Sequence, residues 1–420
     1  MKVVGFWYAE TKRGKWILVA TLIYTFTAVI FALAVVWVDL YYIWGNLYDV
    51  AEIVAAIIPV ISGIVKLSIA TTRRSELINL IVFSEKNFWN AKHDSFGQRV
   101  LRECEKRSII VLCGMAFCVE GTVISYLMKP LFDNQKLNGT DRALPFRLYV
   151  DLPLTVTPYY EITYTIESLS TIYVGISFFC FDNLLSIFNL HVVAQFKILQ
   201  HRLETLCDEY VSHVSDGQQV TEDPHEARNE RYSEDIFGKN VILRTESDCA
   251  KSVIQKNYAD PCKSVNDKLK ACVKRHVFLF DYIERLENLF SWMLFCQIGV
   301  SSCIICFAGF ETFLAGRREL IFHFTGSVLQ TFIFTWTCNE ISLESGKVGE
   351  AAFRSKWYLM PISEARRSLH SSLMLIVIRS RRNSCLTAGK FHKISSQTFK
   401  KIMNTNLSYL SVLRKQIEGT

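Results

Sequence analysis

The sequence predicts an all-α membrane protein in which at least six helices cross the bilayer. Half of the 420 residues are hydrophobic and 13% are aromatic, which is high for a soluble protein. The apolar residues gather in long runs, and residues 17–38 and 288–310 contain no charged side chain. As a helix, either run can cross a hydrocarbon core of about 30 Å.

Six apolar runs follow one another along the chain, and each is predicted to form one membrane-spanning helix. They cover residues 17–40, 51–72, 108–128, 168–192, 286–310 and 319–340. The first run is not typical of a cleaved signal peptide, because it is too long and no small-residue cleavage site follows it. Three spans contain a charged residue away from their ends, Lys66, Glu120 and Asp182. Such charges either hold helices together or contact a ligand or an ion.

The distribution of basic residues predicts a cytoplasmic N-terminus. Lys and Arg are frequent before the first span, in residues 71–107 and in residues 197–275, and they are sparse in the alternate loops. An excess of Lys and Arg marks the cytoplasmic side of membrane helices. The sequon Asn138-Gly139-Thr140 falls in a loop that this rule places outside, so Asn138 is a predicted glycosylation site.

The composition argues against several other classes of protein. The net charge of +7 does not indicate nucleic-acid binding, because the basic residues stand between apolar runs, where they orient the helices. Most of the 13 cysteines lie in apolar runs and none lies in a predicted outer loop, so we expect no disulfide scaffold. Cys303 and Cys306 are close, but they stand in an uncharged run, which disfavours a metal site. Since no catalytic motif is visible, we expect neither an enzyme nor a cofactor.

Two parts of the chain are predicted to lie in the cytoplasm without crossing the membrane. Residues 208–266 are polar and aperiodic, which predicts a disordered loop. Residues 369–378 are apolar but too short to span, and Arg379 follows them, so they are predicted to form a helix packed among other helices.

The last segment, residues 394–416, is predicted to be one amphipathic helix, because apolar and polar residues alternate at spacings of three and four. The apolar stripe contains Phe399, Ile402, Met403, Leu407, Leu410 and Leu413, and the polar stripe contains Gln397, Lys401, Asn404, Ser408, Ser411 and Lys415. Such a helix can lie on the membrane surface, belong to a soluble part, or cross the membrane beside a water-filled path. Its length suits the third arrangement.

A series of motifs resembles the corresponding segments of insect odorant receptors. In the C-terminal part these are Trp357-Tyr358, Arg366-Arg367 before a short apolar segment, Leu-Thr-Ala-Gly-Lys-Phe at 386–391 and Ser-Tyr-x-x-Val-Leu-Arg at 408–414. Further similar segments are GFW at 5–7, LPF at 144–146, and residues 196–206 and 269–291. The order and the spacing of the motifs make the resemblance specific.

The resemblance implies a bundle of seven transmembrane helices with a cytoplasmic N-terminus and an extracellular C-terminus, the seventh helix being residues 394–416. It also implies that helices four to seven extend into a cytoplasmic anchor domain. The expected function is that of the odorant-binding subunit of a ligand-gated, non-selective cation channel. The implied partners are an obligate odorant co-receptor in a heterotetramer, a small volatile apolar ligand, membrane lipid and permeant cations. The expected location is the plasma membrane of the sensory dendrites of olfactory neurons.

The resemblance also indicates which residues to expect in the odorant pocket and in the pore. The outer halves of the second, third, fourth and sixth spans give the pocket candidates Ile57, Ile61, Val123, Tyr126, Tyr173, Ser177, Phe178, Phe322 and Thr325. Hydroxyl groups among them could select an alcohol, an ester or a carbonyl compound. Along the pore we expect Ser408, Tyr409, Ser411 and Val412. Val412 corresponds to the narrowest, hydrophobic point of the pore in the family.

Two other receptor classes are alternatives. Insect gustatory receptors share the fold, but they usually end in Thr-Tyr, apolar residues and Gln-Phe, whereas Leu-Ser-Val-Leu-Arg-Lys follows Ser408-Tyr409 here. A G-protein-coupled receptor would need an external N-terminus and usually an external disulfide, and the sequence supports neither.

Overall fold

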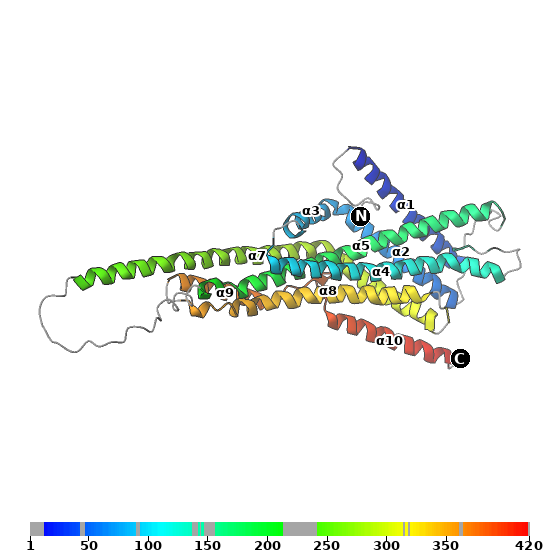
Figure 1. Cartoon of the computed structure of the whole chain (residues 1–420). Coiled ribbons are helices and arrows are strands. Elements are labelled where there is room, and N and C mark those ends of the chain that lie inside the picture. The colour runs from blue at the N-terminus through cyan, green and yellow to red at the C-terminus, as the bar shows by residue number, and fades with distance from the viewer. Residues whose placement is uncertain are drawn as a thin grey trace. The chain divides into compact units, whose positions relative to one another are not determined.

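The computed structural model of the chain is almost entirely helical (Figure 1). It describes residues 12–42, 47–89, 93–136, 142, 144–146, 156–212, 242–313, 316–317, 320–360 and 364–418. The predicted motif at 5–7 and the predicted glycosylation site Asn138 lie outside these residues. The principal helices are α1 (Lys12–Tyr42), α2 (Leu47–Thr72), α3 (Arg74–Ser84), α4 (Ser95–Lys136), α5 (Tyr159–Glu204), α7 (Ile242–Phe313), α8 (Ile321–Phe353), α9 (Glu364–Ser380) and α10 (Ser396–Glu418).

Short elements separate some of these helices. A π-helical turn, η2 (Glu85–Trp89), follows α3, and a 3-10 turn, η4 (Trp357–Leu359), precedes α9. The strands β1 (Thr387–Ala388) and β2 (His392–Lys393) pair antiparallel, with Thr387 opposite Lys393.

The chain forms two compact units. Unit 1 comprises residues 1–194, 282–341 and 385–420, and unit 2 comprises residues 195–281 and 342–384. All seven predicted spans lie in unit 1, and each lies within one helix except for at most two residues at its start, while α4, α5, α7 and α8 extend well beyond the spans.

Unit 1 exposes more large apolar side chains than is usual for a water-soluble protein. On α4, Ile110, Phe117 and Ile124 are 58–71% exposed and recur every seven residues, so they form one outward face. Among the described residues, three helical segments are long and apolar enough to cross a membrane, Lys12–Tyr42, Ser95–Leu131 and Ser264–Phe313. Exposed apolar faces on such segments indicate contact with lipid, and hence a protein that crosses the membrane more than once.

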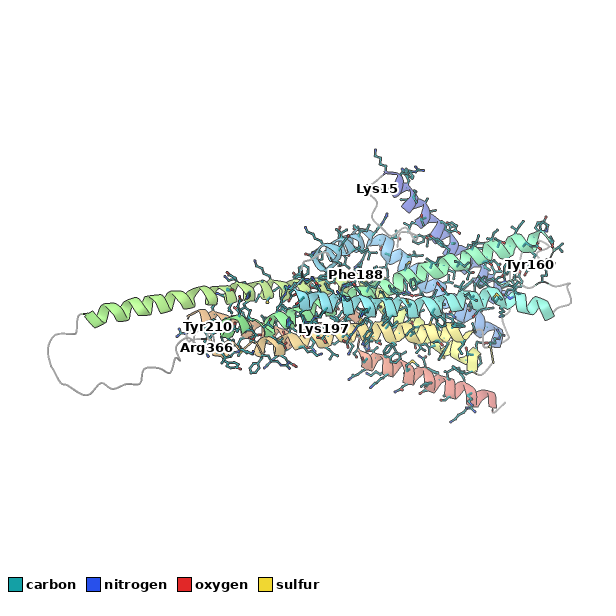
Figure 2. The ribbon with its side chains drawn as sticks, viewed as in Figure 1. Lys15, Tyr160, Phe188, Lys197, Tyr210 and Arg366 are labelled. Carbon is teal, nitrogen blue, oxygen red and sulfur yellow. The ribbon has the colours of Figure 1, made fainter. Side chains whose placement is uncertain are left out.

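The interior of unit 1 is held together by apolar packing between helices distant in sequence. One buried cluster joins α4, α5 and α8, and it contains Cys104, Val111, Met115, Leu190, Ala194 and Ile333. Phe188 of α5 is 1% exposed, and its ring centroid lies 6.3 Å from that of Phe290 on α7 (Figure 2). A second cluster joins Val36 of α1 to Ile53 and Ile57 of α2. These contacts hold α4, α5, α7 and α8 together and join α1 to α2.

The segment Leu-Thr-Ala-Gly-Lys-Phe forms the hairpin between β1 and β2. Gly389 and Lys390 both have positive φ, 63° and 68°, as the tight turn requires. The Gly389 N–H donates to the carbonyl oxygen of Ser291 at 3.0 Å, and the Ser291 hydroxyl donates to the carbonyl oxygen of Thr387 at 2.8 Å. The hairpin is therefore tied to α7 directly before α10 begins.

Replacing Gly389 with alanine is expected to destabilise unit 1 by about 1–2 kcal/mol, the cost of placing a side chain in left-handed backbone. An added Cβ would also stand 2.6 Å from Cε1 of Phe391. Thermal unfolding of the detergent-solubilised protein measures the effect. Gly299→Ala is the matched control, because a Cβ there meets nothing within 4 Å. Equal midpoints for the two variants would contradict the assigned turn geometry.

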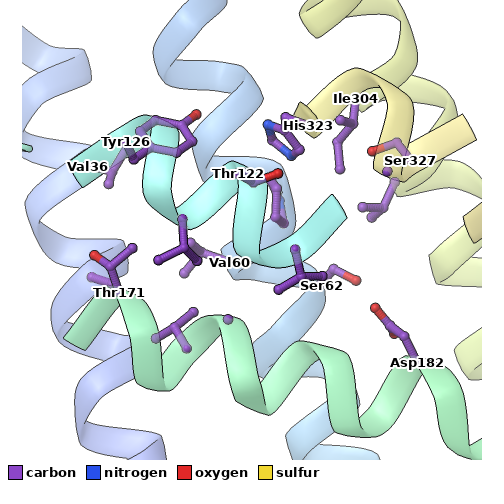
Figure 3. A pocket seen from close by; sticks show the side chains of 18 of the residues that line it. Val36, Val60, Ser62, Thr122, Tyr126, Thr171, Asp182, Ile304, His323 and Ser327 are labelled. Carbon is purple, nitrogen blue, oxygen red and sulfur yellow. The ribbon is translucent and has the colours of Figure 1, made fainter. Parts of the chain in front are cut away.

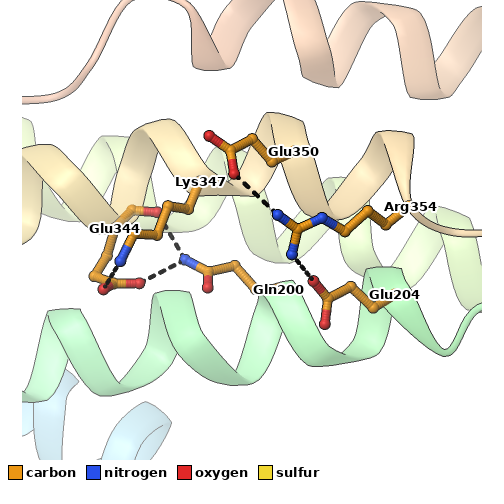
Figure 4. Close-up of polar contacts among 6 residues, drawn as sticks. All are labelled: Gln200, Glu204, Glu344, Lys347, Glu350 and Arg354. Atoms are coloured by element: carbon orange, nitrogen blue, oxygen red, sulfur yellow. Dashed lines mark hydrogen bonds and ion pairs between the residues drawn. The ribbon is translucent and has the colours of Figure 1, made fainter.

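Unit 2 joins the ends of α5 and α8 through a polar network (Figure 4). The Gln200 side-chain amide donates to the carbonyl oxygen of Glu344 at 2.9 Å and to its Oε2 at 2.8 Å. Lys347 Nζ lies 2.9 Å from Oε1 of Glu344, and Arg354 pairs with Glu204 at 3.4 Å. Glu344 is only 4% exposed, and the hydrogen bond from Gln200 and the ion pair with Lys347 compensate the cost of burying its carboxylate.

The cytoplasmic predictions fall in unit 2 and meet two different outcomes. The apolar segment at 369–378 lies in α9, where Leu369, Leu373 and Ile376 are buried on one face, as expected for a packed helix. The predicted disordered loop covers residues 208–266; residues 213–241 lie outside the described part of the chain, and residues 242–266 are helical and form the beginning of α7. They lack apolar periodicity, and the helix continues because each added residue gains a backbone hydrogen bond on a helix already formed.

Candidate functional site

A cavity of about 240 Å³ lies inside unit 1, surrounded by α1, α2, α4, α5, α7 and α8 (Figure 3). Its wall is mainly aliphatic, and representative lining residues are Val36, Val60, Met115, Val119, Val174 and Ile304. The volume is slightly below the roughly 300–1,000 Å³ of sites for drug-sized ligands. The cavity therefore suits a small organic molecule that gains affinity from apolar contact.

A buried polar cluster forms one part of the wall. Asp182 accepts hydrogen bonds from Lys66 Nζ and from the side-chain amide of Gln330, which joins α2, α5 and α8. The Lys66 and Asp182 side chains are only 6% and 11% exposed. Asp182 and Tyr126 stand at opposite ends of the pictured cavity (Figure 3). Of the three charged residues predicted inside the spans, Lys66 and Asp182 thus pair with each other beside the cavity. The third, Glu120, is exposed.

A second polar part of the wall lies near the loop that precedes α5. The backbone N–H of Phe146 donates to Oε2 of Glu167 at 3.2 Å. The Phe146 ring stacks on Tyr126 with centroids 6.2 Å apart, and all three residues line the cavity. Glu167 is 5% exposed, and its Oε1 has no hydrogen-bond partner among the described residues.

Two of the nine predicted pocket residues line this cavity. Val123 and Tyr126 of α4 both belong to its wall. Ile57 instead packs in the cluster with Val36 and Ile53. The side chains of Ser177 and Phe178 lie outside what the structure describes.

The remaining four candidates point to other surroundings. Tyr173 hydrogen-bonds through its hydroxyl to Thr25 of α1 at 2.7 Å. The Phe322 ring contacts Phe117 at 5.7 Å and crowds against α4, and Thr325 and Ile61 are exposed. None of these four residues lines the described cavity.

Sequence reasoning missed several polar residues of the cavity wall, among them His323 and Glu167. His323 stands one residue from Phe322 along α8, and it lines the cavity (Figure 3). On α5 the wall follows Glu167, Thr171 and Val174, a helical spacing of four and three that defines one face. The one signal that the sequence offered for Glu167 is its acidic side chain directly before the predicted span at 168–192.

The exposed end of α5 carries a separate ion pair. Arg142 Nη1 lies 3.0 Å from Oε1 of Glu161, whose side chain is 50% exposed. The Glu161 backbone N–H, with Thr157 and Arg142, holds the pKa of this carboxyl below its usual value. Glu161 is therefore a solvated, paired acid two turns from the buried Glu167.

Helix α10 packs on unit 1 along one face and exposes the other. Phe399 contacts Phe332 at 5.6 Å between ring centroids, and Asn406 is 2% exposed and hydrogen-bonds Ser302 at 3.2 Å. Leu407, predicted in the apolar stripe, is 57% exposed. Asn406 takes the packed position because the Ser302 hydroxyl satisfies its amide.

The four predicted pore residues share the exposed side of α10. They are Ser408, Tyr409, Ser411 and Val412. Val412 is 59% exposed, so this apolar side chain is available to a neighbour that the single chain does not contain.

Comparison with known proteins identifies consistent relatives. The sequence model of the family described as 7tm Odorant receptor matches residues 46–407. The chain is 20% identical over 346 residues to Odorant receptor 13a of Drosophila melanogaster, an alignment that covers 76% of this chain and 69% of that protein. It is 26% identical over 147 residues to Putative odorant receptor 92a of the same species, covering 34% of this chain and only 35% of that relative.

The fold is similar to that of a solved structure. The insect olfactory receptor OR5 from Machilis hrabei matches with a TM-score of 0.73 at 12% identity, over 98% of this chain and 94% of that one. The same receptor in complex with eugenol matches with a TM-score of 0.72. At this identity the similarity concerns the fold, and it confirms the predicted all-α membrane fold class.

Proposed function

This chain belongs to the insect odorant receptor family, and from that premise we propose that it is the odorant-binding subunit of a ligand-gated, non-selective cation channel. In this proposal it assembles with a co-receptor into a tetramer in the plasma membrane of olfactory neurons. The N-terminus is cytoplasmic, seven helices cross the membrane, and unit 2 belongs to the cytoplasmic anchor. The exposed side of α10 lines the path of the cations.

The observation that carries the proposal is the cavity enclosed by six helices of unit 1. The surface of its wall is mainly apolar, although several polar side chains also line it, and this matches a small volatile ligand that has few polar atoms of its own. The receptor of similar fold was solved in complex with eugenol, which supports a small organic ligand here. Binding opens the channel only if the ligand binds the open state more tightly than the closed one.

Co-expression with the co-receptor and recording of odorant-evoked current tests this function. Inward cation current that requires both subunits and depends on odorant concentration is the expected result. Silence across a broad odorant panel, with surface expression of both subunits confirmed, would reject it.

Replacing Tyr126 with alanine is expected to change odorant tuning, because the side chain forms part of the cavity wall. Loss of an aromatic contact should raise the half-maximal concentration of the better ligands about tenfold, equivalent to about 1.4 kcal/mol. Tyr173→Phe is the control, since it removes only the hydroxyl bonded to Thr25 outside the wall. An unchanged rank order in Tyr126→Ala, or a changed one in Tyr173→Phe, would contradict this assignment.

A further inference from the structure

Glu167 is a buried acid, and only one of its two carboxylate oxygens has a hydrogen-bond partner among the described residues. One carboxylate oxygen, Oε2, accepts the Phe146 backbone N–H at 3.2 Å. The other, Oε1, has no hydrogen-bond partner among the described residues, although the side chain is only 5% exposed. A buried carboxylate without a counter-charge is unfavourable, so this group is either protonated or completed by a ligand.

The charges of the cavity wall do not supply that counter-charge. Lys66, the cation among the described lining residues, is paired with Asp182. His323 also lines the wall, and a histidine is mostly neutral at pH 7. The ion pair sums to zero, so an ionised Glu167 leaves the wall with one net negative charge.

The surroundings of Glu167 are those that recognise a cation. Phe146 and Tyr126 both line the cavity, and their rings stack with centroids 6.2 Å apart and planes 19° apart. Aromatic faces attract an ammonium group through their quadrupole, most strongly where water is excluded. A carboxylate that lines the same cavity as two aromatic rings therefore offers both a charge partner and a polarisable wall.

We propose that the preferred ligands of this receptor are small volatile amines, whose protonated nitrogen donates to Oε1 of Glu167 beside Tyr126 and Phe146. This inference rests on the proposed odorant-binding function and narrows its ligand class. The hydrocarbon part of the amine occupies the aliphatic part of the cavity, near Val119 and Val174. A carboxylic acid of the same length would be repelled as its anion. An alcohol can donate a hydrogen bond to the carboxylate, but it brings no positive charge to compensate the buried negative one.

The test compares hexylamine, hexan-1-ol and hexanoic acid on the co-expressed channel at buffered neutral pH. The wild type should respond to hexylamine at a concentration at least about tenfold below that for hexan-1-ol, and only weakly to hexanoic acid. Glu167→Gln should raise the half-maximal concentration of hexylamine at least about tenfold and change that of hexan-1-ol less than about threefold. Glu161→Gln, which removes an exposed acid of the same helix, should change neither.

The outcomes separate the ligand class from the function. Robust current with hexan-1-ol but no amine preference in the wild type would overturn the inference and leave the odorant-gated channel standing. The same holds if Glu167→Gln, present at the cell surface, keeps the full amine preference. Silence to all three probes and to a broad odorant panel would reject the function itself. If Glu167→Gln does not reach the surface, the wild type is compared with Glu167→Asp, which keeps the charge. An amine preference in both supports the inference, and no amine preference in either overturns it.

Discussion

Replacing Asp182 with alanine is expected to lower the free energy of unfolding by about 3–5 kcal/mol. The Asp182 carboxylate is the shared acceptor of Lys66 on α2 and Gln330 on α8, and the Lys66 and Asp182 side chains are 6% and 11% exposed. Its removal leaves a buried ammonium group without a counter-charge in an aliphatic wall. Thermal unfolding in detergent and the amount of receptor at the cell surface should both fall markedly.

Two further variants show whether the unpaired charge is the cause. Glu103→Ala removes one partner of an exposed pair, in which the Arg107 and Glu103 side chains are 38% and 58% exposed, and it should cost no more than about 1 kcal/mol. The double variant Lys66→Met, Asp182→Leu removes both charges while keeping volume, and it should recover most of the loss. A double variant as unstable as Asp182→Ala would show that packing, not charge, explains the effect.

The helices of unit 1 could be predicted from the sequence because an apolar run of sufficient length is a local property. The face that each helix turns to the cavity could not. A span that contacts lipid on one side and protein on the other is apolar all round, so its periodicity does not reveal the inner side. On α5 the prediction selected Tyr173, whereas the wall is formed by Glu167, Thr171 and Val174. The choice between neighbouring faces depends on contacts such as the Tyr173 hydrogen bond to α1, which are tertiary.

Polar residues inside the spans were more informative than apolar ones. Isolated charges are costly in a membrane, so the sequence marks Lys66 and Asp182 as residues with a partner, and the structure pairs them across two helices. On α10, by contrast, the polarity of the side chains does not separate the packed face from the exposed face. Asn406 lies on the packed side and Leu407 on the exposed side, because a hydrogen bond to Ser302 outweighs the simple apolar stripe.

Replacing Val412 with alanine or serine is expected to raise the current that flows without odorant by at least about twofold, as a fraction of the maximal current. We propose that the last helices of the four subunits surround the path of the cations, and that α10 of this chain contributes Val412 at the narrowest point. A ring of apolar side chains closes a pore by excluding water, and a smaller or more polar ring admits it. Because Val412 is 59% exposed in the single chain, its truncation should leave the packing of unit 1 intact. The receptor should therefore reach the surface in normal amounts, and its leak should reflect gating.

Two neighbours on α10 test the position of the gate. Leu410 packs on the bundle, since its Cδ1 lies 3.2 Å from where a Cβ on Gly309 would stand. Leu410→Ala should therefore lower stability without raising basal current. Leu407 is 57% exposed and lies five residues before Val412, about 140° around the helix, so Leu407→Ala probes an exposed position of the preceding turn that faces another direction. A leak caused by Leu407→Ala but not by Val412→Ala would move the gate to that position, and no leak in either would remove both positions from the gate.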